Sequence, residues 1–144
     1  MINKPKTKPY YIENKEPRSL VSDMFSTKVH LEEAQSLTGT HRIKESKGTG
    51  ILEQIILRSN NLNYTFQVII DDDEIYNKPL QFFLTHTAII DNISAYLAGG
   101  IYYLIVQNLY FQQNYSIRVI CTGTVIFSVI MIRQCIRNEE YIGV

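Results

Sequence analysis

From residue 51 onward, short runs of apolar residues alternate with polar turns at intervals of about 8–12 residues, which is typical of an all-β domain. The clearest run is 64–71, where apolar and polar residues alternate one by one except at Ile69. Its apolar positions are Tyr64, Phe66, Val68 and Ile70, and its polar positions are Thr65, Gln67 and Asp71. A period of two residues predicts a strand with one buried face.

The strongest turn signal is the pair Gly99-Gly100. Apolar runs lie on both sides of it, at 93–97 and at 101–107. Glycine adopts the positive φ angles of a tight hairpin turn without a steric penalty. We therefore predict a β-hairpin centred on these two glycines.

The turn 122–124, Thr-Gly-Thr, separates the apolar runs 115–121 and 125–136 and predicts a second hairpin. Seven or eight strands of this kind predict an all-β fold, a β-sandwich of jelly-roll type over residues 48–144. The run 101–106 contains apolar residues and tyrosines only, so both of its faces are expected to be covered. An arm, a helix or another chain would cover the outer face.

Residues 1–47 follow a different pattern. Residues 1–18 contain three prolines and few apolar residues, which predicts an extended arm, because proline interrupts helices and central strands. Residues 19–47 are expected to form a linker. A short helix at about 27–37 is one alternative within this linker, and a helical turn at 80–84 is another possible helical element.

The composition, 45% hydrophobic and 19% charged with a formal net charge of zero, is that of a folded domain. The charge is uneven, since residues 1–50 carry a net +3 and residues 51–144 a net −3. This balance gives no basis for expecting a nucleic-acid partner. The apolar stretch 119–132 is too short to span a membrane, and no apolar stretch follows the first lysines as in a signal peptide. We expect synthesis in a reducing compartment, with Cys121 and Cys135 as free thiols.

Candidate chemistry is sparse. The acidic group Asp71, Asp72, Asp73 and Glu74 is either a solvated hairpin turn or a weak candidate for a cation site, since Ca²⁺ prefers several carboxylate oxygens. His30, His41 and His86 lack the spacing of metal ligands. Cys121 lies in an apolar strand, where burial raises the pKa of a thiol and lowers its reactivity. We expect no catalytic residue, no metal and no cofactor.

Three aromatic pairs are candidates for binding a sugar or a partner, or for packing within the sheet: Tyr10-Tyr11, Tyr102-Tyr103 and Tyr110-Phe111. The arm is expected to be ordered only by contact with another chain. Its lysines would meet an acidic surface, and its apolar residues would supply most of the anchoring. These partner-binding candidates are Lys4, Lys6, Lys8, Tyr10, Tyr11 and Ile12.

The strand opened by Gly48-Thr49-Gly50, the strand that ends in the acidic turn, and the later strand pair together resemble small β-sandwich proteins of virus particles. Such proteins occur in the tails, connectors and capsids of tailed phages and archaeal viruses. The resemblance covers residues 48–136, is architectural and carries over no functional residue. It implies a non-enzymatic structural subunit of a virion, made in the host cytoplasm and assembled with copies of itself and with other virion proteins. The alternative is a ligand-binding module, for example one that binds carbohydrate.

Overall fold

The computed structural model describes residues 24–138, which fall into two compact units. The smaller unit contains residues 24–26 and 137–138. In it, the backbone amide of Asn138 donates to the carbonyl oxygen of Met24 at 2.8 Å, and Ser26 Oγ donates to Asn138 Oδ1 at 2.6 Å. The larger unit, Thr27–Ile136, contains the core and most of each long strand. The expected arm, 1–18, lies outside the described residues.

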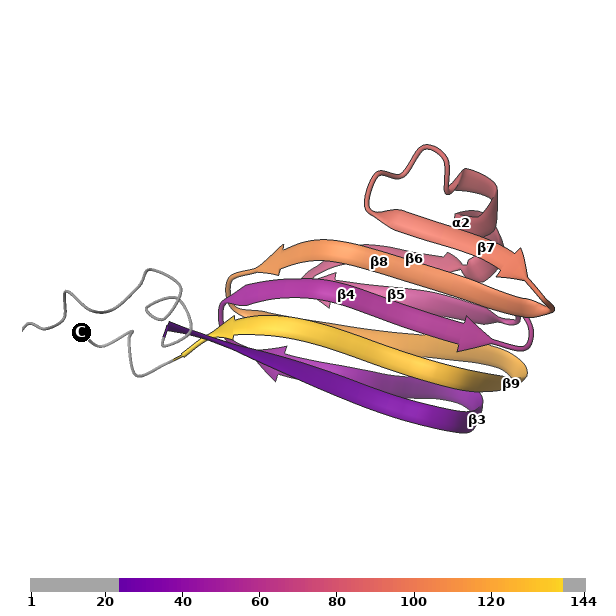
Figure 1. Ribbon diagram of the computed structural model, residues 1–144, viewed down its shortest axis with the longest axis horizontal. Coiled ribbons are helices and arrows are strands. Elements are labelled where there is room, and N and C mark those ends of the chain that lie inside the picture. Colours follow the sequence, from indigo (N-terminus) through magenta and orange to yellow (C-terminus); the bar gives the residue numbers. More distant parts are fainter. Residues whose placement is uncertain (1–23, 139–144) are drawn as a thin grey trace, which may run out of the picture. The chain divides into compact units, whose positions relative to one another are not determined.

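The described residues form seven strands and one short helix (Figure 1). In chain order these are β3 (Phe25–Lys47), β4 (Gly50–Ser59), β5 (Tyr64–Ile70), β6 (Asp73–Pro79), α2 (Leu80–His86), β7 (Ile93–Ala98), β8 (Ile101–Phe111) and β9 (Asn114–Arg137). The prediction of an all-β fold is confirmed. Helix α2 lies at the position of the helical turn expected at 80–84.

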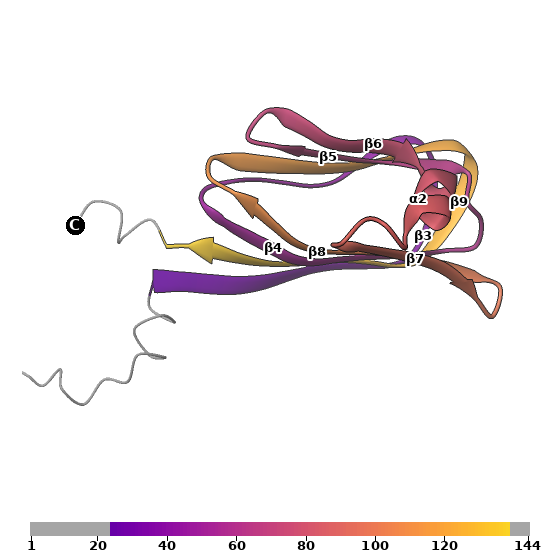
Figure 2. The ribbon, with the colours of Figure 1, turned by 90° about the horizontal axis from the view of Figure 1, so that it is seen from above.

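The strands form one sheet in the order β6-β5-β9-β4-β8-β7, and β3 pairs with β9 outside this path. Strand β9 is long enough to pair twice in antiparallel register. Its residues 115–121 pair with β5, and its residues 127–136 pair with β4. Within the larger unit, β9 curls from one layer to a second layer, and β3 follows the same curl (Figure 2). One layer holds β5 and β6, and the other holds β4, β8 and β7.

The core lies between these two layers. It is built from buried residues of α2 and of every strand except β6, and its largest fully buried side chains include Tyr64, Phe66, Phe83, Phe111, Tyr115 and Phe127. The rings of Tyr64 and Phe127 meet edge to face with their centroids 5.0 Å apart. Phe83 of α2 packs against Phe66 with 6.0 Å between ring centroids. Each such side chain contributes about 1.5–3 kcal/mol by leaving water, so this contact network stabilises both layers and α2.

Two local predictions are confirmed by the strands. Strand β5 buries every second residue from Tyr64 to Ile70, as its alternation predicts. The hairpin of β7 and β8 turns at Gly99 and Gly100, whose φ angles are 58° and 78°. Both angles lie in the left-handed region that glycine adopts without strain.

The short helix considered at 27–37 is wrong, because these residues belong to β3. Exposed and half-buried residues alternate along much of β3, which is the period of an edge strand and not of a helix. Ala34 and Gly39 have φ angles of 55° and 75°, and such residues interrupt regular pairing and let a strand curl. The sheet therefore begins at Phe25, within the segment expected to be a linker, and not at residue 48.

The second predicted hairpin, centred on 122–124, is also wrong, because β9 continues through these residues. The strand is held extended there by neighbours on both sides. The backbone amide of Thr122 donates to Asn63 O at 2.9 Å, and Thr124 Oγ1 lies 3.2 Å from Thr38 Oγ1. Gly123 therefore lies within a continuous strand that curls, and not in a hairpin turn.

Candidate functional site

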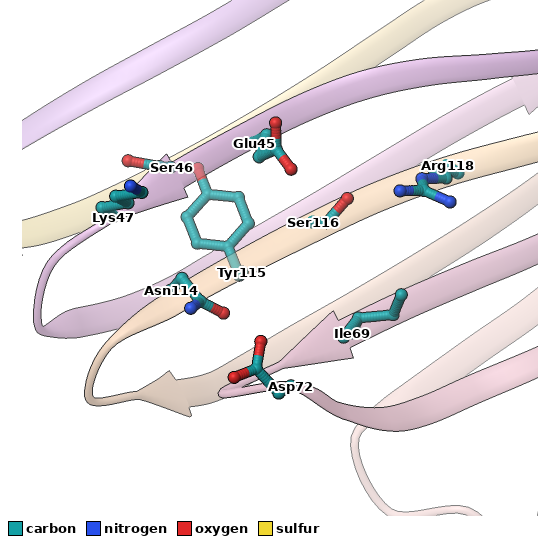
Figure 3. Close-up of a pocket in the computed structure, with 9 residues that line it drawn as sticks. All are labelled: Glu45, Ser46, Lys47, Ile69, Asp72, Asn114, Tyr115, Ser116 and Arg118. Atoms are coloured by element: carbon teal, nitrogen blue, oxygen red, sulfur yellow. The ribbon is translucent and has the colours of Figure 1, made fainter.

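A cleft of about 400 Å³ lies where the end of β3, the start of β9 and the end of β5 meet (Figure 3). We call Ile69, Ser116 and Arg118 its floor, because these residues are buried or half-buried and share one face of the sheet. We call Glu45, Lys47 and Asp72 its rim, because these residues are exposed. Ser46, Asn114 and Tyr115 complete the lining.

The register of β5 and β9 places the floor residues together. Ile69 pairs directly with Ser116, and Gln67 pairs directly with Arg118. Residues two apart on a strand share a face, so Ser116 and Arg118 point to the same side of β9. Tyr115 points to the opposite side, where its hydroxyl donates a hydrogen bond to Gln134 Oε1 in the core. Burial raises the pKa of the Tyr115 hydroxyl, so this group stays a neutral donor.

Two floor groups lack hydrogen-bond partners within residues 24–138: Ser116 Oγ and Arg118 Nε. Ser116 is only 8% exposed, so its hydroxyl is shielded from solvent. An unsatisfied buried polar group costs about 1–3 kcal/mol, and proteins rarely carry one without a reason. Both groups can donate a hydrogen bond, which suits an acceptor in the cleft.

Asp71 fixes the position of the β8–β9 turn, which contributes Asn114 to the lining of the cleft. Its carboxylate accepts hydrogen bonds from the backbone amides of Gln113 at 2.6 Å, Asn114 at 3.1 Å and Gln112 at 3.0 Å. These bonds, led by that of Gln113, lower the pKa of Asp71 because they stabilise its charged form. Asp71 therefore joins the β5–β6 turn to the β8–β9 turn.

This arrangement assigns a structural role to part of the acidic turn that the sequence offered as a weak cation site. Asp71 is engaged by backbone amides, and Glu74 accepts hydrogen bonds from Gln67 and Asn77. Asp72 is on the rim of the cleft, and Asp73 begins β6. Residues 24–138 contain no group of three His, Cys, Asp or Glu side chains placed to hold a metal ion.

The curl of β3 brings two histidines to one glutamate. Glu32 Oε2 lies 2.7 Å from His30 Nε2, and Glu32 Oε1 lies 3.6 Å from His41 Nε2. Sequence spacing could not indicate this cluster, because His41 reaches it only through the bends at Ala34 and Gly39. The third histidine, His86, lies apart from it, with its Nδ1 atom 2.8 Å from Phe82 O.

The two cysteines are free thiols, as predicted. Cys121 pairs with Tyr64, and Cys135 pairs with Ile51, so the two residues are not opposed. Burial raises the pKa of the Cys121 thiol, in the direction that its apolar strand predicts.

The described aromatic candidates have separate environments. Tyr103 stacks on Tyr96 with 4.8 Å between ring centroids, and the guanidinium of Arg58 lies 5.3 Å from the Tyr103 ring. Tyr102 is half-buried against the core, and Phe111 is buried. Tyr110 is 74% exposed. The arm candidates Lys4, Lys6, Lys8, Tyr10, Tyr11 and Ile12 lie outside the described residues.

The chain matches no family model and no curated protein sequence. Within residues 24–138, the single helix is far too short to cross a membrane.

Proposed function

We propose that the chain is a non-enzymatic structural subunit that joins copies of itself along the open edge of β3. The observation that carries the proposal is the exposure of this edge. Among the described strands, β3 pairs with β9 alone, and it runs for 23 residues. The unpaired side of such a strand presents backbone donors and acceptors that another strand can bind.

The exposed apolar side chains of β3 also favour assembly along this strand. Val29 and Leu31 are 58% and 54% exposed, and they lie two positions apart on one face of the strand. Strands β8, β4 and β9 carry a second group of half-buried apolar side chains, since Ile56 pairs with both Ile105 and Met131. A further chain that covered Val29 and Leu31 would remove their side chains from water.

The other two edges are less suited to pairing. Strand β6 carries Asp73, Glu74 and Lys78 and ends at Pro79, and charges and proline discourage edge-to-edge pairing. Strand β7 is only six residues long and packs against α2. These differences favour β3 as the edge that assembles.

A second copy of the chain is the occupant that charge favours. The net +3 of residues 1–50 in one subunit can meet the net −3 of residues 51–144 in another, so identical subunits attract one another. By resemblance to β-sandwich proteins of virus particles, the assembly would be part of a virion, built with other virion proteins after synthesis in the host cytoplasm. The jelly-roll type of sandwich belongs to the same proposal.

Light scattering of the full chain over a range of concentrations tests this proposal. We expect oligomers, and we expect Val29→Lys with Leu31→Lys to shift the chain towards the monomer. Ile89→Lys is a matched control, because Ile89 is 75% exposed and lies between α2 and β7, away from β3. A chain that stays monomeric at all concentrations, or that assembles equally well with both substitutions on β3, would refute the proposal.

The second candidate is a carbohydrate-binding module, which the stacked pair Tyr96 and Tyr103 favours. However, Tyr103 lies between two cross-strand neighbours, Tyr96 and Arg58, which occupy the surroundings of its ring. The half-exposed ring of Tyr96 is therefore the surface on which a sugar would stack. If the chain stayed monomeric and Tyr96→Ala abolished its binding to an immobilised glycan set, this second candidate would replace the first.

A further inference from the structure

The cleft floored by Ile69, Ser116 and Arg118 presents donors that lack acceptors. Ser116 Oγ is buried and has no hydrogen-bond partner within residues 24–138, and the same is true of Arg118 Nε. The described residues also provide no ion pair for the Arg118 guanidinium. Ser116 and Arg118 line the same cleft from one face of β9, so their donors face a common space.

The charges around the cleft favour an acceptor with a single negative charge. Glu45 is balanced by Arg42, whose Nη1 lies 3.4 Å from its Oε1. The carboxylate of Asp71 is engaged by three backbone amides. Amide hydrogen bonds leave Asp71 charged, so Arg42, Lys47 and Arg118 are matched by Glu45, Asp71 and Asp72, and the charges at the cleft sum to zero. A bound monoanion adds one negative charge to this site and a phosphate dianion adds two, so the monoanion is favoured.

We infer that this cleft binds a carboxylate group, with the Arg118 guanidinium and the Ser116 hydroxyl donating to its oxygens. Guanidinium matches carboxylate in planar geometry and charge, and a hydroxyl donor satisfies a remaining lone pair. A volume of about 400 Å³ also leaves room beside the carboxylate for the body of a small acid, against the apolar side chain of Ile69. The carboxylate belongs either to a free small molecule or to an acidic side chain of another subunit.

The test uses the full chain, labelled with ¹⁵N and titrated with sodium acetate at constant ionic strength. Nuclear magnetic resonance follows the Arg118 Nε–H signal and the backbone amide of Ser116. The variants are Arg118→Gln, Ser116→Ala and the control Arg133→Gln. Arg133 lies on the same strand outside the cleft, where its Nε is 3.5 Å from Glu53 Oε1.

We expect saturable shifts of both signals in the natural chain and in Arg133→Gln. We expect binding to weaken by about tenfold or more in Arg118→Gln, because charge-assisted hydrogen bonds are the strong ones. Ser116→Ala should weaken binding less. Its amide spectrum should otherwise be unchanged, which keeps the test valid if Arg118→Gln fails to fold. Shifts that do not saturate, shifts equal in all variants, or tighter binding of inorganic phosphate than of acetate would overturn the inference.

Two further experiments identify the source of the carboxylate once acetate binding is established. If acetate disperses oligomers and Arg118→Gln also disperses them, the natural occupant is an acidic side chain of another subunit. If acetate binds while the oligomers are unaffected, the occupant is a free small acid. The acetate titration follows the Arg118 and Ser116 signals and does not measure assembly. Acetate binding can therefore fail while assembly along β3 stands, and assembly can fail while acetate still binds.

Discussion

The hydroxyl of Tyr115 donates a hydrogen bond to the side-chain carbonyl of Gln134, although the two residues lie 19 positions apart on the same strand. The curl of β9 makes this contact, because Tyr115 pairs with β5 in one layer and Gln134 pairs with β4 in the other. Both side chains are buried. The bond therefore joins the two layers through the core at the position where the floor of the cleft begins.

Removal of this donor should destabilise the larger unit. Tyr115→Phe leaves the Gln134 carbonyl buried without a partner, which costs about 1–3 kcal/mol of unfolding free energy. Urea unfolding followed by circular dichroism measures the change. Tyr110→Phe removes a hydroxyl from an exposed ring and should alter stability little. Equal stability of both variants would show that the bond does not hold the layers together.

Alkaline pH should destabilise the fold through its buried tyrosines. Burial raises the pKa values of Tyr64 and Tyr115 above those in the unfolded chain. The stabilisation is complete below the unfolded pKa of about 10 and is lost as pH rises from there towards the folded values. The urea midpoint should fall above about pH 10, and Tyr115→Phe should show a smaller fall. A urea midpoint that stays constant up to about pH 11.5 would contradict the claim that ionisation of Tyr64 and Tyr115 destabilises the fold.

Asp71 should stabilise the fold only while it is charged. Its pKa is lowered in the folded chain, so its contribution is present above the unfolded pKa of about 3.9 and is lost as pH falls through the folded value. Asp71→Asn should lower the urea midpoint at pH 7 and reduce the loss of stability on acidification. Asparagine tolerates the φ angle of 51° at this position, so the change tests charge and not backbone strain. Asp73→Asn at the start of β6, next to this turn, is the control and should leave both measurements nearly unchanged.

Gly50 should not accept a side chain. A Cβ atom there would lie 2.2 Å from the carbonyl oxygen of Cys135, so β4 and β9 would have to separate. Gly50→Ala should destabilise the chain by about 1–3 kcal/mol, as overpacking does. Gly123→Ala is the matched control, because no atom lies within 4 Å of a Cβ built there. If thermal unfolding gave the same melting temperature for both variants, the close approach of these strands would be refuted.

The sequence predicted correctly those elements whose conformation depends on residues close together in the chain. The alternation of β5 follows from one buried face, and the β7–β8 hairpin follows from the positive φ angles of Gly99 and Gly100. Strands β3 and β9 could not be predicted in the same way. Each of these strands curls at a glycine, Gly39 in β3 and Gly123 in β9. In the sequence, a glycine among polar residues indicates a turn or a loop as readily as it indicates a curl in a continuous strand.

The cleft could be predicted only in part. Ser116 and Arg118 stand two positions apart on one strand, which is a local signal that they share a face. That Ser116 is buried without a partner depends on β3, whose residues at the cleft lie about 70 positions earlier in the chain. The role of Asp71 was missed for a similar reason, since its partners belong to the distant β8–β9 turn.

The central claim, assembly along β3, is tested most directly by amide hydrogen exchange of residues 27–33 in the oligomer and in the dissociated chain. Amides of β3 that face β9 should be protected in both states. Amides that face the open edge should exchange quickly in the monomer and slowly in the oligomer, because a strand of the next subunit would accept their hydrogen bonds. Equal exchange of the open-edge amides in both states would contradict the claim.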